Sequence, residues 1–575
     1  MKTYFFKNKI EILFLITITT FAFFVRFIAI QNFGDLWTDE LYSYYFANQK
    51  SMINVCKTLF LEDFHVPFYY ILLHYWIKIF GNTDITMRLM GCILTTMCIP
   101  VSFYIVKKLF NKLSAYFVCI FLSVNAFNIH YSAELRHYGL SILLALISTF
   151  FFVKMFDKFD KKVCTIYILV SVLLMYTCNF SSLYIFCQFL IGVIYLLIKN
   201  KNFTKLFLIT YFITAICYIP ALMYVIHSSF VYKKSLMIFA RDVFYFDLSY
   251  FWAFLMTTYS NIFEQFMSNN PKLNMLYITH IFTPENVLFI LMPIILGITG
   301  FVLFLHSRNK NIILFLAPAL LLFIFQLIGA FTHNLALTLR YNFITITIIF
   351  IISVCGYCMC KNKKIAISLL IIYLLLNILC YGAKFKHNIF NRNLNFDIPM
   401  SKNVYQIDIN TGDTIFIPRF GKIYKNRYFQ NLNVIDFDTY DAFFINTRPD
   451  IIKFIFGEEL SKKLNRKMMK TYMYDYLSTD MKMYSIYKNM NNEYYSKMKK
   501  GNKFIIITDE ARYFNILPAT ENLFRENINI YKLSAIYDTL SAKIVFDIVN
   551  SAKTYLKTKK IYNVNNIWTI YVFEK

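Results

Sequence analysis

The sequence predicts a polytopic α-helical membrane protein with about 11 transmembrane helices and a C-terminal α/β domain outside the membrane. Three observations support this fold class. Hydrophobic residues make up 58% of the 575-residue chain and aromatic residues 19%, and the mean hydropathy is +0.49. Uninterrupted apolar runs recur up to residue 382, which a soluble fold of this size would not carry. From residue 383 to residue 575 the chain changes to short strand-like and polar helical stretches.

The apolar runs are long enough to cross a bilayer. The first begins near Ile10; it is too long for the core of a signal peptide and no small-residue cleavage site follows it, so we expect it to be retained. The runs cover residues 10–30, 87–106, 113–129, 138–156, 163–179, 181–198, 204–226, 286–305, 311–331, 338–359 and 364–382. We therefore assign residues 1–382 to a transmembrane module with a first outer loop over residues 31–86 and a long outer loop over residues 227–285.

Alternate connections between these runs are rich in Lys and Arg. The six basic sets are Lys2, Lys7 and Lys9; Lys107, Lys108 and Lys112; Lys154, Lys158, Lys161 and Lys162; Lys199, Lys201 and Lys205; Arg308 and Lys310; and Lys361, Lys363 and Lys364. By the positive-inside rule these loops are cytoplasmic. The N-terminus is then on the cytoplasmic side of the cell membrane and the C-terminal domain on the extracytoplasmic side. Much of the net charge of +26 lies in these loops, so it orients the chain and does not argue for nucleic acid.

The segment His65–Phe80 tests this assignment, because it reads as an apolar helix that could be mistaken for a span. If it crossed the membrane, every later basic loop would fall outside. We therefore expect it to lie in the interface, with its Tyr and Trp side chains at the level of the headgroups. The outer face then collects the loop 31–86, the connection Asn128–His137, the turn Thr332–Arg340 and the tail.

The tail contains runs typical of a small α/β domain. The strand candidates are Asp413–Ile417, Asn433–Phe437, Phe443–Asn446, Lys503–Thr508, Lys543–Ile548 and Trp568–Phe573. We expect residues 383–575 to form a soluble domain outside the cytoplasm.

Two adjacent acids, Asp39 and Glu40, follow the first predicted span. Charged groups at a membrane surface are costly to desolvate and contribute nothing to spanning, so they often mark a pathway or a reacting group. The alternative is a hydrated loop whose acids face water. Other ionisable residues that topology places on the same face favour the functional interpretation: Arg26, Asp63, His65, Arg88, Glu134 and Arg136.

Such a set suits chemistry on a lipid-linked anionic substrate. A phosphate leaving group needs positive charge at low dielectric, where Arg can bind it in a bidentate manner. An acceptor hydroxyl needs a carboxylate base within hydrogen-bond reach. The bilayer supplies a prenyl-lipid donor from the side, and because such donors arrive activated, the lack of a Gly-rich phosphate loop in the sequence is no obstacle.

The order of these motifs resembles a known family. Its elements are Val25-Arg26-Phe27; Asp39-Glu40; His65-x-Pro67-x-Tyr69-Tyr70, leading to Phe80-Gly81; Arg88-x-x-Gly91; Pro100; Lys107-Lys108-Leu109-Phe110; and Tyr131-Ser132-Ala133-Glu134-x-Arg136-x-Tyr138. Over residues 10–156 this order is similar to the GT-C glycosyltransferases of the protein O-mannosyltransferase and lipid A aminoarabinose-transferase group. The likeness continues more loosely to Arg340-Tyr341, and the tail resembles the outer domains of bacterial members only in placement.

The resemblance implies roles for the matching residues. Asp39 corresponds to the proposed general base toward the acceptor, and Glu40 to the acidic neighbour that orients or polarises the acceptor. The residues implied in substrate binding are Arg26, His65, Arg88, Glu134, Arg136, Tyr138 and Arg340. In some relatives His and Glu side chains bind a metal. A divalent metal is therefore open as a cofactor, but this chain shows no clear ligand set and we claim no metal site.

Structural alternatives stand beside these roles. Arg26 lies near the end of its span, where a long side chain can snorkel to the surface. Glu134 can form an ion pair with Arg136 or Arg88. Asp63 has the spacing to cap the helix that follows it.

We therefore expect an integral-membrane glycosyltransferase that moves a sugar from a polyprenyl-phosphate donor to a protein, lipid or glycan acceptor on the outer face. If the acceptor is a hydroxyl, Asp39 would deprotonate it as it attacks the anomeric carbon, giving inversion in one step while arginines stabilise the departing phosphate. The alternatives are a membrane transporter or lipid flippase, for which charges near the midplane would be expected, and a membrane-anchored binding protein acting through its C-terminal domain. Membrane lipids are expected partners, and nucleic acid is not.

Overall fold

The computed structural model describes most of the helical region and the strands of the C-terminal region. The described residues are 2–31, 36, 38–63, 65–157, 160–199, 204–243, 248–260, 287–307, 309, 311–331, 339–388, 410, 412–417, 433–436, 492–508, 548–564 and 568–575. The chain divides into two compact units: residues 1–34 with 46–392, and residues 35–45 with 393–575.

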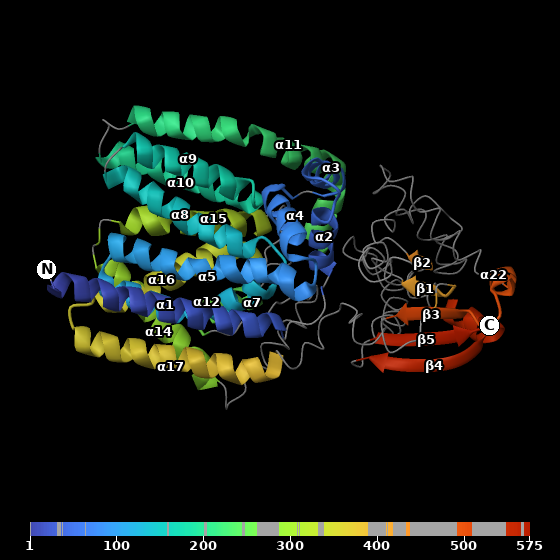
Figure 1. The fold of residues 1–575 in the computed structure, drawn as a ribbon. Helices are drawn as coiled ribbons and strands as arrows, with labels where there is room; N and C mark the ends of the chain where they lie inside the picture. The colour runs from blue at the N-terminus through green and yellow to red at the C-terminus, as the bar shows by residue number, and fades with distance from the viewer. Residues whose placement is uncertain are drawn as a thin grey trace, which may run out of the picture. The chain divides into compact units, whose positions relative to one another are not determined.

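Each of the apolar runs predicted from the sequence forms a helix, and these helices lie side by side in a bundle (Figure 1). They are α1 (Lys2–Gln31), α5 (Asp84–Leu109), α6 (Lys112–Ser123) with α7 (Ala126–Ala133), α8 (Tyr138–Asp157), α9 (Lys161–Met175), α10 (Asn179–Lys199), α11 (Thr204–Val243), α14 (Val287–His306), α15 (Ile312–Phe331), the 3-10 turn η2 (Leu339–Asn342) with α16 (Phe343–Met359), and α17 (Lys363–Asn388). Among the described residues, seven helices are long and apolar enough to cross a membrane, or up to eight if the bent pair α6–α7 is one span. The predicted polytopic helical class is confirmed.

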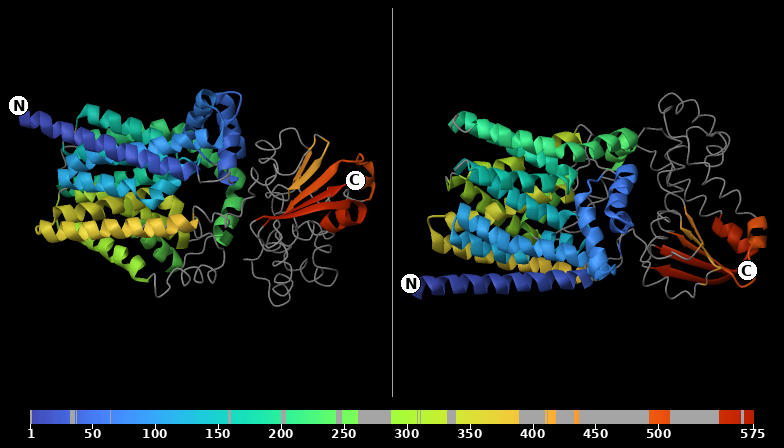
Figure 2. Two further views of the ribbon diagram at one scale, coloured as in Figure 1. Left: turned by 60° about the horizontal axis from the view of Figure 1, so that its bottom comes forward. Right: turned by 45° about the horizontal axis from the view of Figure 1, so that its top comes forward.

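The outer helices of the bundle carry apolar side chains on their exposed surfaces. Helices α1 and α11 lie at opposite edges of the bundle in the right-hand view of Figure 2. Leu13 on α1 and Phe212 on α11 are each 66% exposed. Exposed apolar surface of this extent on a span faces lipid, as expected for a membrane protein.

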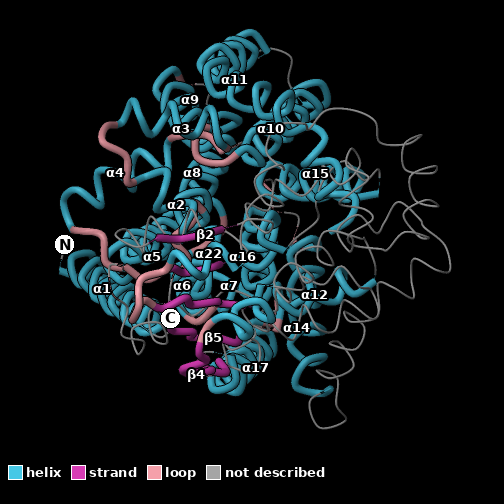
Figure 3. The backbone as a smooth tube through the Cα atoms, turned by 90° about the vertical axis from the view of Figure 1, so that its right-hand side faces the viewer, coloured by secondary structure: helices cyan, strands magenta, loops and turns pink. Residues whose placement is uncertain are grey.

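Helix α16 lies in the middle of the bundle (Figure 3) and nearly all its side chains are buried. It approaches α14 so closely that a Cβ atom added to Gly356 would lie 1.8 Å from the carbonyl oxygen of Gly300 and 2.8 Å from the backbone N of Phe304. A Cβ on Gly300 would in turn lie 2.2 Å from the carbonyl oxygen of Ser353. Small residues at a helix contact allow this approach, which maximises packing where lipid provides no hydrophobic driving force.

A buried polar cluster joins α8, α9, α10 and α11. The side-chain oxygen of Gln188 accepts hydrogen bonds from the hydroxyls of Tyr167, at 2.8 Å, and Ser148, at 3.3 Å. The Tyr167 hydroxyl also lies 2.6 Å from that of Tyr211. Interhelical hydrogen bonds of this kind hold membrane helices in a fixed register.

Connections from different basic sets meet at one end of the bundle, as the charge pattern predicted. Lys107 and Lys112 both form ion pairs with Glu11. The side-chain amide of Asn311 donates to the carbonyl of Leu109 at 2.9 Å. The Lys-rich ends of α1, α5 and α6 and the start of α15 are therefore neighbours, at the end of the bundle where the N-terminus lies in Figure 1.

Three further helices follow α1: α2 (Thr38–Ala47), α3 (Met52–Glu62) and α4 (Phe68–Phe80). Helix α4 begins beside the end of α9, because the N–H of Phe68 donates to the carbonyl of Tyr176 at 3.0 Å. It ends beside the start of α5, where the indole N–H of Trp76 donates to the carbonyl of Thr86 at 2.7 Å. Both ends of α4 thus lie at the end of the bundle opposite to the basic connections, and α4 does not cross, as the parity argument predicted.

This topology gives a labelling prediction. Single cysteines placed at Leu61 and at Asn82, in a background without native cysteines, should both react with a membrane-impermeant maleimide added to intact cells. Both positions are exposed and flank α4. A cysteine at Lys154 is the matched control, because that residue lies at the basic end and should react only after the membrane is permeabilised. Reaction of Leu61 and Asn82 from opposite sides would contradict the assignment.

The second unit contains a five-stranded sheet in the order β2-β1-β3-β5-β4. The strands are β1 (Thr414–Ile417), β2 (Asn433–Asp436), β3 (Lys503–Thr508), β4 (Lys557–Val564) and β5 (Trp568–Glu574), and a short helix α22 (Asn492–Lys497) precedes β3. Strands β2, β1 and β3 are parallel, whereas β3, β5 and β4 pair antiparallel. The buried Asp413 carboxylate fixes the start of β1, because it accepts from the backbone N–H groups of Asn410 and Lys503.

Four of the predicted strands are present, as β1, β2, β3 and β5. The candidate Phe443–Asn446 lies outside the described residues, as does all of Lys543–Ile548 except Ile548, which is helical. Strand β4 was not predicted, because Lys residues interrupt its apolar alternation. It is one of the two edge strands of the described sheet, and lysines on an edge discourage pairing with another chain.

Candidate functional site

Polar and aromatic side chains gather in the first unit at the end of the bundle opposite to the basic connections. They come from the α3–α4 connection, the α7–α8 turn and η2. Each of these is an irregular segment between helices, where backbone can present side chains without belonging to a packed helical face. The residues predicted for substrate binding in these segments are His65, Glu134, Arg136 and Arg340.

The α7–α8 turn is placed by a break in the preceding span. Helices α6 and α7 meet at an angle of 53°, and the Asn125 side chain caps α7 by accepting from the N–H of Asn128 at 3.0 Å. The guanidinium of Arg26, 1% exposed, donates to the carbonyls of Leu122 at 3.0 Å and Ser123 at 3.4 Å, at the end of α6. A helix end leaves carbonyls without intrahelical partners, so Arg26 stabilises the break and does not snorkel to the surface.

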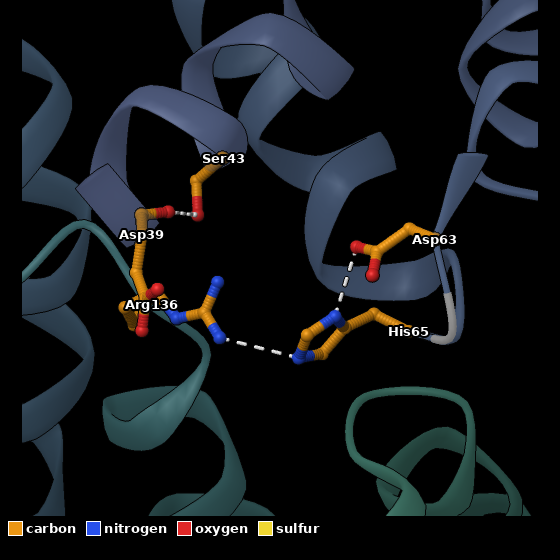
Figure 4. Close-up of polar contacts among 5 residues, drawn as sticks. All are labelled: Asp39, Ser43, Asp63, His65 and Arg136. Carbon is orange, nitrogen blue, oxygen red and sulfur yellow. Dashed lines mark hydrogen bonds and ion pairs between the residues drawn. The ribbon is translucent and has the colours of Figure 1, made fainter. Parts of the chain in front are cut away.

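A chain of three side chains links the two sides of the site (Figure 4). Oδ2 of Asp63 lies 2.9 Å from Nδ1 of His65, and Nε2 of His65 lies 3.2 Å from Nη2 of Arg136. Capping of α4 by Asp63, the structural alternative that the spacing allowed, is not what the structure has. The N-cap of α4 is Pro67, with no side-chain cap bond, and the carboxylate of Asp63 binds His65 instead.

His137, which sequence analysis did not single out, lies in the middle of these cations. Its ring packs near those of His65, Tyr69, Tyr138 and Phe343, with centroids 4.8 to 6.4 Å away. Burial, followed by the positive charges of Arg136 and Arg340, lowers the pKa of His137 well below its usual value. The imidazole is therefore neutral at physiological pH, and the positive potential that keeps it neutral also favours an anion nearby. Its place beside Arg136 in the motif was the signal that could have found it.

Glu134 does not form the ion pair that was considered as its structural alternative. Its Oε1 lies 3.0 Å from Nε2 of His130, one helical turn earlier. Between Glu134 and Arg136 the backbone N–H of Arg136 donates to the backbone carbonyl of Glu134 at 2.8 Å. The Glu134 side chain is 3% exposed, and its Oε2 is buried with no hydrogen-bond partner among the described residues. The spacing of His130 and Glu134, four residues apart, could have predicted their contact.

Arg340 and Tyr138 are also buried at this end. Arg340 lies over the ring of Tyr341, 5.3 Å from its centroid, and that ring stacks on Phe180 at 4.5 Å. Tyr138 packs against Tyr131, with centroids 4.5 Å apart. An arginine held on an aromatic face keeps its N–H donors directed for planar recognition.

Arg88 reaches the same region through close packing of α5. It is 1% exposed and lies one turn before Gly91, where a Cβ would be 3.1 Å from the carbonyl of Ser132 and 3.4 Å from that of Glu134. The Arg88-x-x-Gly91 motif thus has a structural reason. Glycine lets the end of α7 approach α5, and Arg88 then lies near the Glu134–Arg136 turn.

The acidic pair forms the first turn of α2. Asp39 is half-buried and Glu40 is buried, and the Ser43 hydroxyl donates to the backbone carbonyl of Asp39 at 3.0 Å. Acids in a first turn interact favourably with the helix dipole. The last residue of α2, Ala47, accepts a 2.7 Å hydrogen bond from Nδ1 of His74 on α4.

A metal centre finds no support in this part of the molecule. Within the described ranges, no group of three or more His, Cys, Asp and Glu side chains is placed to hold a metal ion. The pair His130–Glu134 would supply two ligands at most. No step below is routed through a metal.

Comparisons with known proteins agree with the resemblance seen in the sequence. The model of the dolichyl-phosphate-mannose-protein mannosyltransferase family matches residues 65–224. That segment contains the α3–α4 connection from His65 onward and the whole α7–α8 turn. No curated protein sequence matches the chain.

Solved structures are similar to this chain over most of its length. ArnT from Cupriavidus metallidurans bound to undecaprenyl phosphate is 10% identical, with a TM-score of 0.53 and coverage of 98% of each chain. In the apo state it gives a TM-score of 0.51 at 10% identity, covering 89% of this chain and 95% of ArnT. The oligosaccharyltransferase AglB from Archaeoglobus fulgidus, in complex with an inhibitory peptide and a dolichol-phosphate, is 10% identical, with a TM-score of 0.47 and coverage of 90% and 72%.

The fold of this chain is therefore that of ArnT. The segment that matches the dolichyl-phosphate-mannose-protein mannosyltransferase family, residues 65–224, contains His65, Arg136 and His137. The predicted resemblance to GT-C glycosyltransferases is confirmed.

Proposed function

We propose that the protein is an integral-membrane glycosyltransferase that moves a sugar from a polyprenyl-phosphate donor to an acceptor outside the cytoplasm. The observation that carries this proposal is the cluster of buried cationic side chains around His137, which lies in the segment that matches the mannosyltransferase family. Buried arginines beside a neutral imidazole form an anion site, and a lipid phosphate is the anion that a bilayer supplies at this level.

The proposed reaction is a single displacement at the anomeric carbon. A bond forms between the acceptor oxygen and the anomeric carbon while the bond from that carbon to the phosphate oxygen breaks, and the phosphate leaves with the electron pair. Asp39, from its match to the family motif, takes the proton of an acceptor hydroxyl, and Glu40 orients the acceptor. Arginine side chains stabilise the charge that develops on the leaving phosphate.

Arg136 and Arg88 are the preferred phosphate-binding residues, and Arg340 is the next candidate. Both Arg136 and Arg340 act on the pKa of His137, and both come from irregular segments at the site end of the bundle. Arg26 donates to the end of α6 and so has structural partners of its own. The N-terminus is proposed to be cytoplasmic and the C-terminal domain extracytoplasmic, and the acceptor is a protein, a lipid or a cell-envelope glycan.

The direct test uses the full chain in proteoliposomes with polyprenyl-phosphate sugars that differ in the sugar. Consumption of one donor, together with mass spectrometry of surface glycans, lipids and proteins from cells with and without the gene, identifies sugar and acceptor. Movement of the lipid across the bilayer without cleavage of its sugar phosphate would instead support a flippase.

Substitution of Arg136 or Arg88 with Lys is expected to weaken use of the donor measurably while the protein still inserts and folds. Lys keeps the charge but loses the planar fork of N–H donors. The measurement is initial rate against donor concentration and, separately, against acceptor concentration, with a rise in the donor KM and little change in the acceptor KM. If both variants match the unchanged protein at every donor concentration, the phosphate lies at Arg340.

A further inference from the structure

We propose that Asp63 and His65 are positioning residues that fix the direction of the Arg136 guanidinium toward the donor phosphate. This inference rests on the proposed function and adds to it, because the resemblance implied substrate binding for His65 without a mechanism and assigned no role to Asp63. Its basis is the hydrogen-bonded chain Asp63–His65–Arg136 (Figure 4).

The direction of the two hydrogen bonds determines which nitrogen of His65 carries the proton. A guanidinium has only N–H donors, so Nε2 of His65, 3.2 Å from Nη2 of Arg136, must accept. The proton of the neutral ring is then on Nδ1, from which it is donated to Oδ2 of Asp63 at 2.9 Å. Asp63 thus selects the tautomer that allows His65 to hold Arg136, as a carboxylate does behind many functional imidazoles.

The helix end at Asp63 uses the backbone of this residue, whereas its carboxylate contacts His65. Asp63 is the C-cap of α3 through its backbone N–H, which donates to the carbonyl of Leu59. The side chain is 12% exposed and that of His65 16%. The hydrogen bond between these two largely buried side chains orders the connection between α3 and α4. The residue that His65 then binds, Arg136, is 71 residues further along the sequence, on the α7–α8 turn.

An imidazole suits this task because it orients a cation without adding a negative charge of its own. A carboxylate placed directly on the same Nη2 atom would compete with the phosphate for the guanidinium. His65 instead binds one N–H donor of the guanidinium with a neutral acceptor, and Asp63 holds the other nitrogen of the imidazole. Arg136, 7% exposed, is held in a fixed rotamer, which lowers the entropy lost on binding phosphate.

The test measures binding of undecaprenyl phosphate to the purified full chain in nanodiscs, because this probe requires no knowledge of the sugar. His65→Leu removes the acceptor and should weaken binding about tenfold. His65→Gln places an amide oxygen near the position of Nε2 and should bind within about threefold of the unchanged protein. Asp63→Ala should weaken binding about threefold, and adding it to His65→Leu should cause no further loss, because the chain is already broken.

Two variants are matched controls. Asp160→Ala removes a carboxylate that caps α9 by accepting from the N–H of Lys162, and His306→Leu removes an exposed imidazole that bonds the carbonyl of Val302. Both should leave binding unchanged, and thermal melting compares the folding of all variants. Equal binding by His65→Leu and the unchanged protein, or no recovery in His65→Gln, overturns the positioning role alone. Failure of the unchanged protein to bind the probe rejects the proposed donor, and the positioning role with it.

Discussion

Asp39→Asn is expected to lower sugar transfer by about 100-fold or more while donor binding stays intact. The substitution keeps the size of the side chain but removes the basic carboxylate that we assign to the acceptor proton. The measurement is the transfer rate at saturating donor, together with the affinity for undecaprenyl phosphate. Activity within a few-fold of the unchanged protein would reject Asp39 as the base.

The matched control for this experiment is Asp84→Asn. Asp84 lies in the first turn of α5, as Asp39 lies in the first turn of α2. Both substitutions remove a favourable interaction with a helix dipole, which is worth about 0.3–1 kcal/mol. A loss of transfer in the Asp39 variant alone separates proton transfer from helix stability.

Gly356→Leu is expected to destabilise the helical bundle by about 3 kcal/mol or more. The new Cβ would meet backbone atoms of α14, at 1.8 Å from the carbonyl oxygen of Gly300, and backbone cannot rotate away as a side chain can. Helices α14 and α16 would have to separate, and every side chain around the central α16 would repack. Thermal melting in detergent, followed by size-exclusion chromatography, measures the effect.

Thr299→Leu serves as the comparison for this substitution. Thr299 is next to Gly300 on α14 but is only half-buried, with its hydroxyl bonded to the carbonyl of Ile295 within the same helix. A leucine there adds similar volume toward lipid and should change the melting temperature little. Similar losses in both variants would show that the Gly300–Gly356 contact is not the cause.

The sequence allowed the helical bundle to be predicted because the information is local. Each span requires only a run of apolar residues of sufficient length, and the loop charges assign its direction. The sequence also predicts that α4 does not cross the membrane, because one more span would place every later basic loop outside. In the second unit four apolar strands were predicted, whereas β4 was not, because its lysines interrupt the apolar alternation.

The site was predicted less completely, because its contacts join residues far apart in the chain. The motifs predicted His65 and Arg136 as site residues, but the contact between them depends on how α4 packs against the bundle. The partners of Arg26 exist only because the span breaks after Ser123, and an apolar run does not reveal such a break. In the sequence, Asp63 is close enough to cap α4 or to bind the ring of His65. The structure shows that its carboxylate binds the ring.

The bend between α6 and α7 has a consequence for the depth of the site. Helix α6 has 12 residues and α7 has 8, so a straight helix of both would rise about 30 Å, the thickness of the hydrocarbon layer. If α6 stands along the bilayer normal, the 53° bend reduces the rise to about 25 Å. On the proposed function, the turn that carries Arg136 would then lie about 5 Å below the level it would otherwise reach. A prenyl phosphate could meet the guanidinium there with its chain still fully inserted in the leaflet.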